Sequence, residues 1–135
     1  MPAFIHYSRT AHVIRLIAGI MCLMAILFIS LFAFDVFDPA LSVLQQIQAF
    51  LLHMIPSFLL LAMLIFAWKK ALTGGIVILL TGLLLSPFVF THNYQMNHNV
   101  WMSLGIIVLI NLPFVLVGAL FIVSAYLQHK SHLPV

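Results

Sequence analysis

The sequence predicts an all-α protein: one domain of four transmembrane helices, packed as an up-down bundle with both termini in the cytoplasm. Three observations predict this fold. The 135 residues are 65% hydrophobic and only 5% charged, whereas about a quarter of the residues of a soluble domain are charged. The apolar residues form four runs, and each run is close to the ~20 residues that cross a bilayer. The basic residues and the acidic residues fall on opposite sides of the four crossings.

The predicted spans are residues 13–34, 46–68, 72–90 and 101–127. The first run is longer than the ~7–15 apolar residues of a cleaved signal peptide, so we interpret it as a retained span. Pro39 discourages the helix from continuing through the first loop. Lys69 and Lys70 alone separate the second run from the third, which predicts a tight helical hairpin, and the polar residues 91–99 are predicted to form the second loop. None of the runs alternates apolar and polar residues as the strands of a membrane barrel do.

The distribution of charge predicts the orientation. All basic residues lie in three segments that four crossings place on one side of the membrane: Arg9, Arg15, Lys69, Lys70 and Lys130. Cytoplasmic segments carry the excess of Lys and Arg, so both termini are expected in the cytoplasm.

Composition also restricts the function. Five scattered basic residues make no surface for nucleic acid. Four spans with short loops leave no room for a separate soluble catalytic domain. The single cysteine, Cys22, excludes an intrachain disulfide. The expected partners are therefore membrane lipids and a membrane protein or a second copy of the chain.

Polar side chains are predicted at one depth in the membrane. Counted from the cytoplasmic end of each span, the candidates lie roughly 22–24 Å above the boundary, at ~1.5 Å per residue: His53, Asn111, Ser86 and Ser30. An ionisable side chain at this depth is costly and normally faces protein or water. Two interpretations stay open. The groups either form a dry structural layer or line a small hydrated pocket with Asp35 near its mouth.

Small residues predict where the helices pack. Glycine lets the backbones of membrane helices approach closely. The candidate packing residues recur at helical spacing within the spans: Gly75, Gly82, Gly118 and Gly19. We expect these stripes to meet in the middle of the bundle.

The second predicted loop contains a weak candidate for a copper site. His92 and His98, with Met96 between them, offer imidazole and thioether ligands. Their spacing is not a known ligand pattern, and a solvated polar loop is the favoured interpretation. A haem with two axial histidines would need His92 to dip inward to join His53, which is disfavoured. The sequence therefore predicts no metal and no cofactor.

Several landmarks carry a resemblance to a known family. They are Asp35-Val36-Phe37, His53-x-x-Pro56, Trp68-Lys69-Lys70 with Gly74-Gly75, and Leu112-Pro113 with Gly118-x-Leu120-Phe121. Over about residues 13–123 the chain resembles a family of small, uncharacterised bacterial four-helix membrane proteins. This resemblance implies four spans in the bacterial cytoplasmic membrane and supplies no activity. Small multidrug exporters and DoxX-like proteins have a similar topology, but the exporters are expected to carry a glutamate in their first span, and this chain has no glutamate.

Three functions remain open. The favoured hypothesis is a membrane protein without its own catalysis that serves as an accessory or interaction subunit. The first alternative is a binder or carrier of a small ligand or proton through the polar layer centred on His53. The second is an enzyme acting on a lipid or quinone. No Gly-x-Ser-x-Gly turn marks a nucleophile, so more weight falls on the first two.

Overall fold

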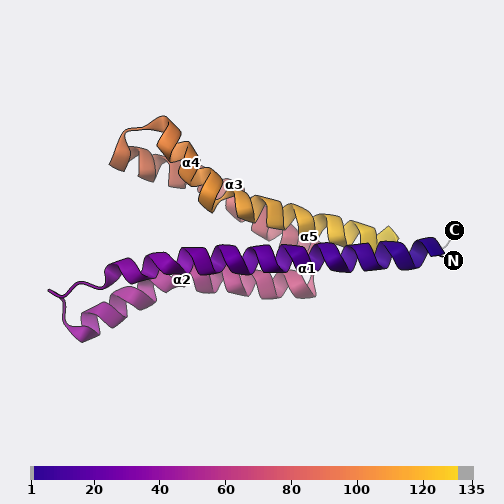
Figure 1. The fold of residues 1–135 in the computed structure, drawn as a ribbon, viewed down its shortest axis with the longest axis horizontal. Helices are drawn as coiled ribbons and strands as arrows, with labels where there is room; N and C mark the ends of the chain where they lie inside the picture. Colours follow the sequence, from indigo (N-terminus) through magenta and orange to yellow (C-terminus); the bar gives the residue numbers. More distant parts are fainter. Residues whose placement is uncertain (1, 131–135) are drawn as a thin grey trace.

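The computed structural model describes residues 2–130, and all of its regular elements are helical. In chain order these are α1 (Pro2–Leu31), the short 3-10 helix η1 (Phe32–Val36), α2 (Val43–Lys69), α3 (Ala71–Asn97), α4 (Val100–Ile110) and α5 (Leu112–Lys130), as Figure 1 shows. Four stretches are long and apolar enough to cross a membrane: Arg9–Val36, Val43–Lys69, Ala71–Asn97 and Val100–Lys130. The prediction of an all-helical protein with four long apolar helices is confirmed.

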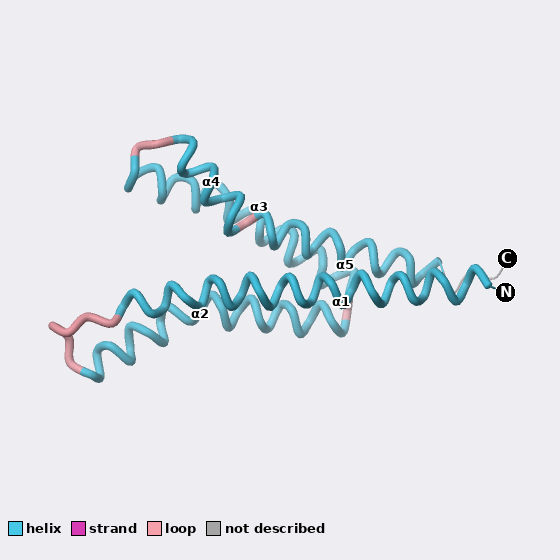
Figure 2. Tube along the Cα trace, viewed as in Figure 1, coloured by secondary structure: helices cyan, strands magenta, loops and turns pink. Residues whose placement is uncertain are grey.

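The structure arranges these helices as two hairpins. One hairpin is α1 with α2, and the other is α3 with the α4–α5 pair. The hairpins meet near the chain termini and diverge towards the opposite end, where the connections within each hairpin lie (Figures 1 and 2). At the end where they meet, α1 and α3 both pack against α5.

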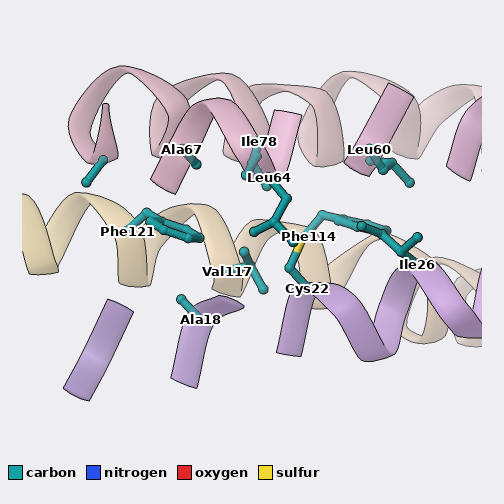
Figure 3. Packing of buried hydrophobic residues seen from close by; sticks show 11 residues of the cluster. Ala18, Cys22, Ile26, Leu60, Leu64, Ala67, Ile78, Phe114, Val117 and Phe121 are labelled. Atoms are coloured by element: carbon teal, nitrogen blue, oxygen red, sulfur yellow. The ribbon is translucent and has the colours of Figure 1, made fainter. Parts of the chain in front are cut away.

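The apolar core lies where the hairpins meet. Its buried residues come from all four long helices: Ala18, Cys22, Ile26, Leu60, Leu64, Ala67, Ala71, Ile78, Phe114, Val117 and Phe121. Figure 3 shows α5 in the middle of this cluster, with Phe114 and Val117 between the residues of α1 and those of α2 and α3. The helix ends beside the α1–α2 and α3–α4 connections contribute little to this core. The protein is therefore closely packed at one end and open at the other.

The second loop is much shorter than predicted. The sequence assigned residues 91–99 to a loop, but α3 continues to Asn97 and only two residues join it to α4. Polar side chains in this stretch bond back to the helix, as when Asn93 Nδ2 donates to the Val89 carbonyl over 2.8 Å. His98 then ends the helix in the left-handed conformation, at φ 51°. The loop prediction was wrong because the polar residues extend the helix beyond the apolar span.

The second helix begins three residues earlier than the predicted residue 46. Ser42 and Gln45 form a capping box: the Gln45 side chain accepts from the Ser42 N–H over 2.9 Å, and Ser42 Oγ accepts from the Gln45 N–H over 3.4 Å. These bonds satisfy backbone donors that the first turn of a helix leaves open. The helix therefore begins at Val43.

The turn between α2 and α3 consists of Lys70 alone. Its N–H donates to the Phe66 carbonyl over 2.8 Å, and its own carbonyl accepts from Gly74 over 2.8 Å. A Cβ at Gly74 would collide with the backbone of Ala67. Only glycine allows the two helices to come this close immediately after the turn.

The fourth stretch is interrupted at Asn111, between α4 and α5. Pro113 has no backbone N–H and cannot continue the hydrogen-bond ladder of the preceding turn. The Asn111 carbonyl instead accepts from the N–H groups of Phe114 and Val115, over 3.1 and 3.2 Å. At this break the Asn111 side chain is buried against α3, where its Nδ2 donates to the Gly82 carbonyl.

Candidate functional site

Three of the predicted polar residues take part in two separate contacts, one in each hairpin. In the first hairpin, Ser30 Oγ donates to the Ile26 carbonyl over 2.8 Å and lies within hydrogen-bond distance of Ser57 Oγ, at 3.0 Å. In the second hairpin, the Asn111 amide contacts Ser86. Among the described residues, no hydrogen bond joins Ser30 or Ser57 to either of these two. The sequence placed the polar residues at one depth, but the structure does not bring them into one layer.

The contact in the second hairpin is a closed network around Gly82. The Gly82 carbonyl accepts from Asn111 Nδ2 over 3.1 Å and from Ser86 Oγ over 2.8 Å. Asn111 Nδ2 also donates to Ser86 Oγ over 3.0 Å. A carbonyl oxygen can only accept, so the bond to Gly82 identifies the nitrogen of the Asn111 amide. Both of its N–H donors are therefore used inside the protein.

His53 does not take part in either contact. Its side chain is exposed, and Nδ1 lies 2.9 Å from the Ala49 carbonyl of the same helix. Ser57, one turn further along the same face of α2, is only 2% exposed. Ala49, one turn away on the other side of His53, is half-buried, so His53 is the exposed position between two residues that the protein covers at least in part. The expectation that His53 lies at the centre of a polar layer therefore does not match the structure.

Asp35 lies in η1 and is exposed. Neither a hydrogen bond nor an ion pair joins Asp35 to His53 in the part of the chain that the structure describes. The expected pocket with Asp35 at its mouth and His53 inside is not formed by these side chains.

An apolar cavity of about 350 Å³ separates the two hairpins beside Asn111. Its lining comes from all four long helical stretches: Ile29, Phe32, Pro56, Leu59, Leu60, Met63, Thr81, Gly82, Leu85, Val89, Ile110, Asn111 and Phe114. His53, Ser30 and Ser86 are not among these residues. Asn111 is predictable from the sequence as a buried polar residue, but the cavity is not. The only indication of the cavity in the sequence is that Pro56, Gly82 and Asn111 lie within a few residues of one another in depth.

The glycine candidates lie at close helix contacts. A Cβ on Gly75 would lie 2.8 Å from the Gly118 carbonyl, and one on Gly118 would lie 2.5 Å from the Leu79 nitrogen. A Cβ on Gly82 would lie 3.0 Å from Cγ2 of Val115. A Cβ on Gly19 would lie 2.6 Å from the Trp68 ring. Glycines 75, 82 and 118 thus join α3 to α5, whereas Gly19 joins α1 to the end of α2.

The residues of the weak copper candidate lie near the end of α3. The His92 ring stacks on Phe88 with centroids 6.4 Å apart, and the His98 ring meets Tyr94 edge-on at 6.2 Å. Met96 is 73% exposed. Over residues that the structure describes, no group of three or more His, Cys, Asp or Glu side chains lies close enough to hold a metal ion.

Comparisons with known proteins identify a family and nothing more specific. Neither the curated proteins nor the solved structures give a match to this chain. A family described as "Domain of unknown function (DUF7670)" matches residues 7–134, which is nearly the whole chain. The resemblance to an uncharacterised family is thereby confirmed. The chain belongs to the DUF7670 family.

Proposed function

We propose that this chain is an integral protein of the bacterial cytoplasmic membrane that crosses the bilayer four times and acts, without catalysis of its own, as an interaction subunit. Outside its helices, residues 2–130 comprise only residues 37–42, Lys70, residues 98–99 and Asn111. Such short connections offer little surface outside the bilayer. A partner would therefore be contacted mainly through the membrane-embedded faces of the helices.

The arrangement of charge supports both termini being cytoplasmic. Arg15, Lys70 and His129 line one shallow depression of about 400 Å³, so the basic segments gather at one end of the protein. Asp35 and Asp38 lie at the opposite end, beside the connection between α1 and α2 (Figure 1). An end rich in Lys and Arg is retained in the cytoplasm.

Reporter fusions test this orientation. A reporter fused after Val135 should be active as a cytoplasmic protein, whereas one inserted between His98 and Asn99 should be active only outside the cytoplasm. Paired fusions of green fluorescent protein and alkaline phosphatase at both positions give opposite signals. Phosphatase activity at Val135 would contradict the proposed orientation and the depth assigned to every polar residue.

The interaction proposal rests on the exposure of His53. This side chain lies at membrane depth in the proposed topology, roughly 22 Å from the cytoplasmic boundary, yet the protein itself leaves it uncovered. An ionisable residue facing lipid is costly, and such residues are normally covered by protein or water. We infer that a helix of a partner, or of a second copy of the chain, covers the face of α2 that contains Ala49 and His53.

Site-specific photocrosslinking in cell membranes tests this contact. A photoreactive amino acid at Ala49 should give a protein adduct of one defined mass. The same amino acid at Leu51, which is 53% exposed on the opposite side of α2, should give lipid adducts only. His53→Leu should reduce the protein adduct at position 49, because the partner's polar group then loses its hydrogen bond. Equal labelling at positions 49 and 51, unaffected by His53→Leu, would contradict the proposal.

A further inference from the structure

The cavity between the hairpins has the size and lining of a ligand site. Its volume of about 350 Å³ lies within the usual range for small-molecule pockets, ~300–1,000 Å³. Apart from Asn111 and Thr81, its lining side chains are apolar. Thr81 Oγ1 donates to the Val77 carbonyl of its own helix over 2.8 Å. Asn111 is therefore the group most able to give the cavity chemical specificity.

The oxygen of the Asn111 side chain has no partner. The residue is only 3% exposed and uses its nitrogen in the network around Gly82. None of the described donors bonds to Oδ1. Every fully buried side-chain N or O atom in the described residues has a partner, so Oδ1 is not fully buried. Asn111 lines the cavity, and its oxygen is the unpaired acceptor that a ligand there could use.

The lining of the cavity favours an aliphatic chain, because nearly all of the side chains that surround it are apolar. Along α3 its lining extends from Thr81 to Val89, which spans about 12 Å. The shape therefore suits a single chain lying parallel to the helices.

We propose that this cavity binds a single-chain lipid whose polar end carries an O–H or N–H donor. The donor bonds to Asn111 Oδ1, and the chain lies along the apolar lining, in contact with Leu60, Met63 and Phe114. An ether or ester end without a hydrogen would leave Oδ1 unsatisfied. His53 does not line this cavity, although it lies one turn from Pro56 on the same face of α2.

Binding of 1-dodecanol and of dodecyl methyl ether to the protein in nanodiscs tests the site. Each compound competes against tritiated 1-dodecanol, with empty nanodiscs as the background. The two compounds share the chain and the oxygen, but only the alcohol has a donor. We expect the alcohol to bind about three- to tenfold more tightly, the effect of one hydrogen bond. Absence of saturable binding, or equal affinity of the two compounds, would overturn the proposal.

A matched pair of variants locates the binding. Leu85 lines the cavity, whereas the neighbouring Leu84 is 73% exposed and does not. Leu85→Trp fills the space and should abolish dodecanol binding, and Leu84→Trp should leave it unchanged. If Leu85→Trp changed the oligomeric state but not dodecanol binding, the cavity would be a protein contact and the lipid proposal would be wrong.

The role of Asn111 is tested by the ratio of the two affinities. In Asn111→Leu the alcohol should lose its advantage over the ether, so the ratio should fall to about one while the ether still binds. A ratio that stays at the wild-type value would show that the donor does not bond to Asn111. The Leu85 and Leu84 variants keep the proposal open to refutation even where Asn111→Leu does not fold.

Discussion

Gly118→Ala should be strongly destabilising. The added Cβ would lie 2.5 Å from the Leu79 nitrogen and 2.6 Å from the Gly75 carbonyl oxygen. Both atoms belong to the backbone of α3, so no side chain can rotate away and the two helices must separate. Overpacking of this kind costs about 1–3 kcal/mol, and we expect the upper end of that range. Thermal unfolding of the purified protein in detergent measures the loss as a lower Tm.

Gly105→Ala is the matched control for this effect. A Cβ at Gly105 would meet no other atom within 4 Å, and the residue lies inside α4. Alanine restricts the unfolded chain more than glycine and favours the helix, so this change should stabilise by about 0.4–1 kcal/mol. The two substitutions are chemically identical and should have opposite signs. Equal Tm values for both variants would refute the close contact between α3 and α5.

Gly74→Ala should open the hairpin between α2 and α3. The new methyl group would overlap the backbone of Ala67 and lie 2.6 Å from its Cβ. Because Lys70 alone joins the helices, the turn has no spare residue with which to absorb the displacement. We expect a loss of about 2–3 kcal/mol, measured as the shift in thermal unfolding.

Thr73→Ala provides the comparison at the same turn. Thr73 is exposed and adjacent to Gly74, so its substitution should change stability by no more than about 0.5 kcal/mol. A Gly74→Ala protein as stable as Thr73→Ala would show that the turn is looser than the structure indicates.

The four helices could be predicted from sequence because spanning a bilayer depends on the length and composition of each apolar run. The packing glycines were also predictable. Close approach of two backbones requires a missing side chain, as at Gly75 and Gly118, and this requirement leaves a repeated pattern in the sequence. The ends of the helices were less predictable, because polar residues such as Asn93 can extend a helix beyond its apolar part.

The divergence of the hairpins could not be predicted. In a soluble protein, apolar residues mark the inner face of a helix, but in lipid the outer face is equally apolar. His53 and Asn111 therefore look alike from sequence, since both interrupt apolar runs at the same calculated depth. The structure buries Asn111 beside the cavity and leaves His53 exposed. Only the relative arrangement of the hairpins distinguishes the two residues.

The most direct test of this account measures whether the two hairpins diverge in a bilayer. Pairs of spin labels in nanodiscs, on a Cys22→Ala background, compare the two ends by pulsed electron paramagnetic resonance. One pair, Leu41→Cys with Val100→Cys, measures the distance between the α1–α2 connection and the α3–α4 connection. The other, Arg15→Cys with Thr73→Cys, lies around the shallow depression at the packed end. We expect a longer distance for the first pair than for the second. Equally short distances at both ends would show a closed four-helix bundle and contradict both the cavity and the exposure of His53.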